Sequence, residues 1–189
     1  MSLPRDLKEL QSAQAAGESL DYLFFPDCGS FNDPPTTSAL SQWATTPFVL
    51  DNLEFHSAEQ AMMHGKAILF DDEEIADRIL KCRTPFTAKN LGAQVRGFSE
   101  PTWKSRRFEI VVAANFPKFF QIPSLRELLI STGKSILVEA SATDLVWGNG
   151  LDAFDPAASD PSRWPGLNLL GFALMEVRAM VMDRAEHRA

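Results

Sequence analysis

The sequence predicts an α+β fold that is predominantly helical, with a minor β-sheet and two long loops. Its 189 residues, of which 45% are hydrophobic and 23% charged, suffice for one globular domain with its own core. After residue 57, apolar side chains recur mostly at helical spacing, whereas strand-like patterns are few and short. Two stretches rich in Gly, Pro, Asp and Asn interrupt this pattern and predict the loops.

The first residues predict a short surface helix. Charged side chains alternate there with Leu3, Leu7 and Leu10, unlike the continuous apolar stretch of a secretory signal. We therefore predict a helical extension over residues 1–20 and a main domain over residues 21–185. No apolar run approaches the roughly 20 residues that cross a bilayer. The expected protein has no membrane partner and is cytoplasmic.

The elements of the main domain follow from composition and spacing. Residues 27–46 are irregular, and the next two short runs, 48–50 and 53–55, flank a turn at Asp51 and Asn52 and predict a hairpin. Ser57 and Gln60 have the spacing of a capping box, so a helix is expected to begin after Ser57. Later elements are helices over 73–82, 85–91, 101–120, 124–131 and 168–184, a strand over 136–139, and an irregular stretch over 148–166.

The charge of the chain is unevenly distributed. A net charge of −7 argues against nonspecific binding to duplex DNA. The segment 78–126, however, contains ten Lys or Arg and two acidic residues, a local net charge of +8. Solvated helix faces explain most individual charges of this kind. Together, the cations favour a local anion site, most simply a phosphate pocket.

Several functional classes lack their characteristic residues. The three histidines and two cysteines have no metal-ligand spacing, so neither a metal site nor a cofactor is predicted. The chain also has no phosphate-binding loop, no dinucleotide-binding glycine motif and no nucleophile elbow. Nucleotide hydrolases, dinucleotide oxidoreductases and serine esterases therefore lose support.

Glu59 and Lys66 are candidate catalytic residues on the helix after Ser57. They are seven positions apart, so they share a helix face and lie about 10 Å apart along the axis. Burial of that face would raise the pKa of the carboxyl and lower that of the amine, which suits a general acid and a nucleophile. The helix dipole opposes the first shift. Two solvated surface charges are the alternative, because Lys and Glu are rarely buried.

The segment from Asp144 to Gly150 is a second candidate. Gly148 and Gly150 permit close approach of the backbone to a ligand, and Trp147 offers a face on which a base or a ribose can stack. Asp144 is near enough in sequence to reach the same pocket. A tight turn beside a core tryptophan is the alternative, because such glycine patterns are common.

These residues belong to a larger pattern that resembles the YbiA/NADAR (NAD- and ADP-ribose-associated) family. The resemblance runs from about Phe24 to Arg178, with the order and spacing of the family's motifs. The motifs are Ser41-Gln42-Trp43, Ala58-Glu59-Gln60 with Lys66, Ala88-Lys89-Asn90-Leu91-Gly92, Trp103 with Arg107, Lys118-Phe119, Val138-Glu139-Ala140-Ser141, Asp144 to Gly150, and Gly166 to Gly171 followed by Met175 and Arg178.

The resemblance implies a YbiA-like catalytic domain that hydrolyses an N-glycosidic bond. Family members act on ribosylamino-pyrimidine phosphates of riboflavin synthesis or remove ADP-ribose from guanine. By motif match, Glu59 is the catalytic acid/base, Lys66 an amine able to form a transient Schiff base with the opened ribose, and Asp144 a third catalytic residue. The implied substrate-binding residues are Ser41, Trp43, Lys89, Trp103, Arg107, Trp147, Gly148, Gly150 and Asn168.

The chain departs from the family's pattern at Ala61, Gly65 and Ala93. Ala61 and Gly65 are smaller than the residues usual at these positions, which predicts a wider pocket or a more flexible helix. Ala93 stands where the family frequently has an Arg that contacts phosphate, and Arg96 is near enough in sequence to supply that contact instead. A non-catalytic sensor of ADP-ribose or a nucleotide is therefore the second hypothesis. The predicted partner is a small phosphorylated ribosyl or ADP-ribosyl substrate, with ADP-ribosylated nucleic acid as the alternative. The sequence predicts no oligomeric state.

Overall fold

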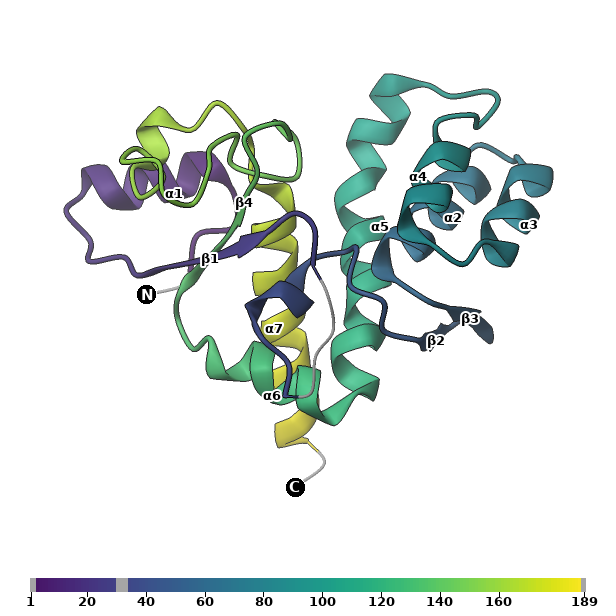
Figure 1. Cartoon of the computed structure of the whole chain (residues 1–189). Coiled ribbons are helices and arrows are strands. Elements are labelled where there is room, and N and C mark those ends of the chain that lie inside the picture. The colour runs from purple at the N-terminus through teal and green to yellow at the C-terminus, as the bar shows by residue number, and fades with distance from the viewer. Residues whose placement is uncertain (1–2, 30–33, 188–189) are drawn as a thin grey trace.

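The computed structural model describes residues 3–29 and 34–187, and this part of the chain forms helices and two small two-stranded sheets (Figure 1). The α+β prediction is therefore confirmed. The helices are α1 (Leu7–Ala15), α2 (Ala58–Leu69), α3 (Glu73–Lys81), α4 (Pro85–Gly92), α5 (Glu100–Gln121), α6 (Pro123–Ser131) and α7 (Leu169–Glu186), with short 3₁₀ helices η1 (Thr37–Leu40) and η2 (Pro161–Arg163). The strands are β1 (Tyr22–Pro26), β2 (Phe48–Leu50), β3 (Leu53–Phe55) and β4 (Ile136–Ala140).

The two sheets differ in how well the sequence predicts them. The hairpin of β2 and β3 is as expected, and Asp51 and Asn52 both have positive φ, the backbone that a tight hairpin turn requires. Strand β1 was not expected. It pairs in parallel with β4, with Phe25 opposite Glu139, and more than half of the chain separates the two strands in sequence. Positions 30–33 of the predicted first loop lie outside the described residues.

Helix α2 begins at the predicted capping box. The Ser57 hydroxyl accepts a hydrogen bond from the Gln60 backbone N–H, and the Gln60 side-chain oxygen accepts the N–H of His56 at 2.7 Å. The amide of Gln60 also donates to the carbonyls of Ile79 and Cys82, at the end of α3. One side chain thus fixes both the start of α2 and the packing of α3 against it.

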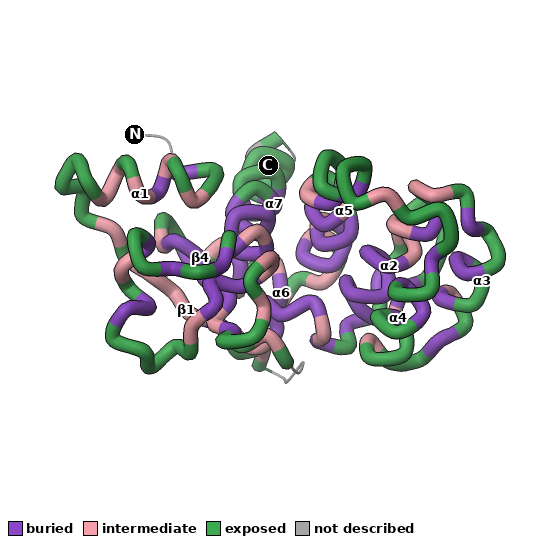
Figure 2. Tube along the Cα trace, turned by 90° about the horizontal axis from the view of Figure 1, so that it is seen from above, coloured by how far each residue is buried: buried purple, intermediate pink, exposed green. Residues whose placement is uncertain are grey.

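Helices α5 and α7 form the centre of the molecule. Helix α5 packs against α2 on one side and against α7 on the other, and α7 in turn covers β4. Figure 2 shows that buried residues gather on α2, α5 and α7. None of the helices in the described ranges is both long enough and apolar enough to span a bilayer.

A close contact joins α7 to β4. Asn168, with a φ of 53°, ends the second loop, and its side chain accepts the Glu139 N–H and donates to the Leu137 carbonyl. A Cβ atom at Gly171 would lie 2.0 Å from that carbonyl oxygen, so only glycine allows α7 to approach β4 this closely.

Candidate active site

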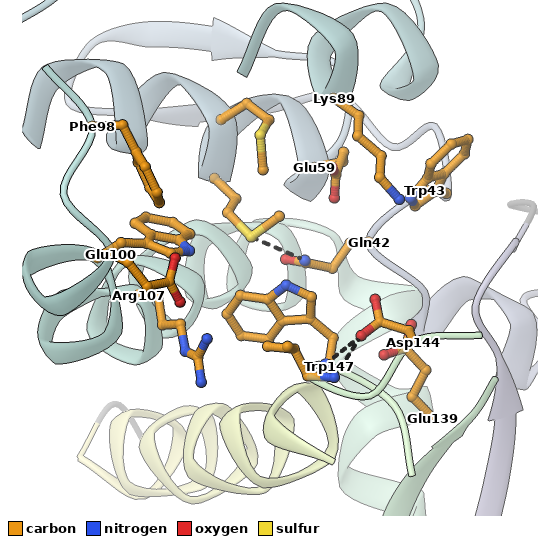
Figure 3. A pocket seen from close by; sticks show the side chains of 14 residues that line it. Gln42, Trp43, Glu59, Lys89, Phe98, Glu100, Arg107, Glu139, Asp144 and Trp147 are labelled. Atoms are coloured by element: carbon orange, nitrogen blue, oxygen red, sulfur yellow. Dashed lines mark hydrogen bonds between the residues drawn. The ribbon is translucent and has the colours of Figure 1, made fainter. Parts of the chain in front are cut away.

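A pocket of about 320 Å³ opens between α2, α4 and α5 on one side and β4 with the following loop on the other (Figure 3). This volume lies at the small end of the range for ligand pockets. Its lining residues are Gln42, Trp43, Glu59, Met62, Met63, Lys89, Phe98, Glu100, Trp103, Arg107, Glu139, Asp144, Val146 and Trp147. Seven of the residues predicted for the site are among them: Trp43, Glu59, Lys89, Trp103, Arg107, Asp144 and Trp147.

Glu59 projects from the first turn of α2 into this pocket. Its side chain is 4% exposed, and its backbone N–H donates to the Gln42 carbonyl at 3.0 Å. The pKa of Glu59 is raised to about 7, chiefly by burial; the charge of Lys89 opposes this rise, and the charge of Asp144 adds to it. With a pKa of about 7, this carboxyl can exchange a proton near neutral pH.

Glu139 lines the pocket but is not among the site residues predicted from the sequence. It lies on β4, it is 5% exposed, and burial raises its pKa to about 8, with smaller contributions from the charges of Asp144, Asp27 and Glu59. The available signal was an acidic residue at the end of an otherwise apolar predicted strand, Ile-Leu-Val-Glu, because charged side chains are rarely buried.

Asp144 organises the loop that carries Trp147. Its Oδ1 accepts the backbone N–H groups of Val146 and Trp147 at 2.8 and 2.7 Å, while its carboxyl lines the pocket beside Glu139 (Figure 3). The geometry gives Asp144 a structural role and an electrostatic one. Among the described residues, no group of three or more His, Cys, Asp or Glu is arranged to hold a metal ion.

Basic and aromatic side chains are paired along the pocket. The Lys89 ammonium lies 5.5 Å from the ring centre of Trp43, and the Arg107 guanidinium carbon lies 6.0 Å from that of Trp147. Arg107 is 8% exposed, and no hydrogen bond joins its guanidinium to another described residue. Of the ten cations in segment 78–126, these two line the pocket, so the predicted anion site uses few of them.

Lys66 lies beside the pocket wall. Its ammonium donates to the Gly92 carbonyl at 2.8 Å and lies 4.5 Å from the ring centre of Phe98 and 5.7 Å from that of Trp103. Burial lowers its pKa. Lys66 is not among the lining residues, and the amine that shares the pocket with Glu59 is that of Lys89.

Four of the predicted binding residues lie outside the pocket and hold the segments that form it. Ser41 is fully buried, and its hydroxyl donates to the Asp27 carbonyl, whereas the Asn168 side chain is bound to β4. The backbone of Gly148 lies against Asp144 and Glu139, and Gly150, with a φ of 79°, packs against Pro165. None of these four lines the pocket.

The departures from the family's pattern point away from the pocket. Ala61 packs with Phe48 and Phe55, and a Cβ at Gly65 would contact the Ile110 side chain. Their small size therefore serves helix packing and does not widen the cavity. Arg96 forms ion pairs with Asp72 and Glu74, so it does not replace the missing phosphate contact.

Lys118 and Asn115, one turn apart on α5, support the segment before the pocket. The Lys118 ammonium is completely buried and donates to the Ser41 carbonyl at 2.8 Å, and the Asn115 amide donates to Oε1 of Gln42 at 3.1 Å. Burial lowers the pKa of Lys118 to about 7. These contacts fix Gln42, whose carbonyl in turn receives the Glu59 N–H.

Stability is expected to depend on pH through Lys118. The unfolded chain binds this proton up to about pH 10.4, whereas the folded chain releases it near 7, so this group makes wild-type stability rise with pH between those values. Unfolding by denaturant at pH 6 and pH 9 should therefore show that Lys118→Met gains stability relative to wild type at the lower pH. Exposed Lys134→Met is the control, and a pH-independent difference would contradict the expectation.

Comparisons with known proteins identify the family of the chain. The sequence model of the NADAR domain family matches residues 30–182. The chain is similar to N-glycosidase R617 of Acanthamoeba polyphaga mimivirus, at 39% identity over 166 residues that cover 85% of this chain and 96% of the relative. It is similar to N-glycosidase YbiA of Escherichia coli (strain K12), at 28% identity with coverages of 73% and 78%.

Two further comparisons concern a plant protein and a solved structure. The riboflavin biosynthesis protein PYRR, chloroplastic, of Zea mays is 33% identical over 113 residues, which are 58% of this chain and 16% of the relative. The NMR structure of E. coli YbiA superposes with a TM-score of 0.67 at 23% identity, covering 97% of this chain and 95% of the other, and so has the same fold. From the family match and the mimivirus relative it follows that the chain belongs to the NADAR domain family.

Proposed function

We propose that this protein is an N-glycosidase that cleaves the bond between base and ribose in a phosphorylated ribosyl compound. Hydrolysis of an N-glycosidic bond is the activity named for its relatives R617 and YbiA. The substrate is a ribosylamino-pyrimidine phosphate or an ADP-ribosylated guanine. The observation that carries the proposal is the buried carboxyl of Glu59, whose pKa is raised to about 7 in a pocket with aromatic and basic walls.

The pocket supplies what this reaction requires. As the bond breaks, positive charge develops on the sugar and the departing nitrogen needs a proton, so carboxyls suffice for the chemistry. The burial and raised pKa of Glu59 support it as the acid/base. Trp43, Trp103 and Trp147 offer faces for the base or the ribose, and Lys89 and Arg107 offer charges for phosphate.

The assay follows the product by mass spectrometry: guanosine from ADP-ribosylated guanosine, and free base from the ribosylamino-pyrimidine phosphate. Purified protein is incubated with ADP-ribosylated guanosine and, separately, with 5-amino-6-ribosylaminouracil phosphate. Release from one of them selects the substrate class. Tight binding of both without any product would favour the alternative sensor function, and neither binding nor product from folded protein would refute the proposal.

Borohydride trapping tests the proposed amine. A Schiff base forms when an amine condenses with the aldehyde of the opened ribose and loses water, and reduction makes the bond permanent. Lys66 must first leave the Gly92 carbonyl, whereas Lys89 already lies in the pocket. Peptide mapping of a trapped adduct identifies the lysine. An adduct on Lys66 should be absent from Lys66→Ala but present in Lys89→Ala, and an adduct on Lys89 should show the reverse. Turnover without any trapped adduct would argue for catalysis by charge alone.

Arg107→Gln is expected to raise KM for a phosphorylated substrate by about 10- to 100-fold, the value of one or two charge-assisted hydrogen bonds. The reason is that this buried guanidinium has no hydrogen-bonding partner among the described residues and faces the pocket. Steady-state kinetics with the phosphorylated and dephosphorylated substrates measure the effect. Exposed Arg106→Gln is the matched control, and an equal change of KM for both substrates would exclude a phosphate contact.

A further inference from the structure

We infer that Glu139 is a second catalytic carboxyl, which gives its proton to the departing base nitrogen while Glu59 takes a proton from the attacking water. The inference rests on the proposed function and divides its acid and base roles between two residues. Glu59 projects from α2 and Glu139 from β4, and both line one pocket (Figure 3).

The backbone of Glu139 is held by hydrogen bonds, whereas one oxygen of its carboxyl has no hydrogen-bond partner among the described residues. Glu139 pairs with Phe25 across the sheet. Its backbone N–H donates to the side-chain oxygen of Asn168, and its backbone carbonyl accepts the N–H of Asn149. Oε2 is buried and has no hydrogen-bond partner among the described residues. A buried oxygen without a partner is costly, and such groups are concentrated where a ligand completes the bonding. Glu139 lines the pocket, so a substrate bound there would lie against its side chain.

The surroundings of Glu139 favour its protonated form. Four anionic or potentially anionic groups face it from different elements: Asp27 and Cys28 after β1, Glu59 on α2, and Asp144 in the loop after β4. Lys89 on α4 is the opposing cation. Burial is the main reason that the pKa of Glu59 is raised to about 7 and that of Glu139 to about 8, so between these values Glu139 holds its proton while Glu59 has lost its own.

The proposed step is balanced. The bond between C1 of the ribose and the base nitrogen breaks, and its electron pair stays on nitrogen, which receives the proton of Glu139. Water adds its oxygen to C1 and gives one proton to Glu59. The products are the free base with a new N–H and ribose with a hydroxyl at C1. Transfer of the proton from Glu59 through solvent back to Glu139 restores the enzyme.

Glu139→Gln tests the role of the proton. Glutamine keeps the size and neutrality of a protonated glutamate but cannot transfer its proton, so kcat is expected to fall by about 100-fold or more while KM changes little. Wild-type kcat should decline above pH 8, where Glu139 loses its proton, and the variant should lack this decline. Exposed Glu127→Gln on α6 is the matched control.

Asp27→Asn is the more selective test. Asp27 contributes to the raised pKa of Glu139 but does not contribute to that of Glu59. Removal of its charge should therefore lower the pKa of Glu139 and move the alkaline decline of kcat to lower pH, while the acid limb near pH 7 stays in place. Unchanged limbs, or wild-type kcat in folded Glu139→Gln, would overturn the inference.

A spectroscopic measurement separates this inference from the proposed function. In protein labelled with ¹³C at the glutamate carboxyls, one resonance should titrate near pH 8 and be absent from Glu139→Gln. Titration of that resonance below pH 5 would refute the acid role of Glu139 even if wild type releases base. A wild type that releases no base would refute the proposed function, whatever the titration shows.

Discussion

Glu59→Gln is expected to reduce base release by about 10²- to 10⁴-fold, the usual contribution of a general acid or base. Glutamine fits the volume of the buried side chain but exchanges no proton. The acid limb of the kcat profile, set near pH 7 by the raised pKa of Glu59, should disappear with it. Mass-spectrometric rates from pH 5 to 9 measure both effects.

The same substitution is expected to stabilise the fold above neutral pH. The folded carboxyl holds its proton up to about pH 7 and the unfolded one only to about 4.5, so the burial of Glu59 costs stability progressively between these values. At pH 8 the variant should gain on the order of 3 kcal/mol. Glu54→Gln, at an exposed position, is the control for both activity and stability. Retained activity, or a loss of stability at pH 8, would contradict this account of Glu59.

Gly171→Ala is expected to destabilise the protein strongly. The added methyl group would lie 2.0 Å from the backbone oxygen of Leu137, and a strand carbonyl cannot move aside as a flexible side chain can. Helix α7 must then withdraw from β4, which costs at least the 1–3 kcal/mol typical of overpacking. Thermal unfolding followed by circular dichroism measures the loss.

Gly65→Ala is the matched control for this substitution. It is the same change within a helix, but its new methyl group would meet the Ile110 side chain at 2.9 Å. A small movement there is offset by about 1 kcal/mol of helix propensity. A midpoint nearly equal to that of wild type is expected. If Gly65→Ala and Gly171→Ala unfolded at the same temperature, the destabilisation by Gly171→Ala would not be due to the contact between α7 and β4.

Local patterns in the sequence predict much of the fold. The capping box at Ser57 and the turn at Asp51 and Asn52 depend on neighbours a few positions away, and both have the predicted form. Strand β1 could not be predicted in this way, because its partner β4 is distant in sequence and parallel pairing leaves no turn signal between them. The five-residue run Tyr-Leu-Phe-Phe-Pro is also too short to distinguish strand from helix.

The site shows the same limit. Motif matches identified Glu59 and Trp147 as residues of one pocket, but not which way each neighbouring side chain points. Lys66 and Asn168 match the motifs, yet their polar groups bind the Gly92 carbonyl and β4 outside the pocket. Glu139 lies in one of the motifs but was not predicted as a site residue, because only the tertiary structure brings β4 opposite α2. Direction and burial of side chains are decided by packing between elements, which spacing along the chain does not specify.

The long-range pairing of β1 with β4 has a consequence for how activity is acquired during folding. Helices α2, α3 and α4 are contiguous in sequence, so Glu59 and Lys89 can reach their places through short-range contacts. Glu139 is placed only after β4 finds β1, a loop closure across more than half of the chain, and such non-local contacts form slowly. The refolding protein should recover its helical circular dichroism signal first and its catalytic turnover last. Pairing of β1 with β4 should be the step after which the protein becomes active.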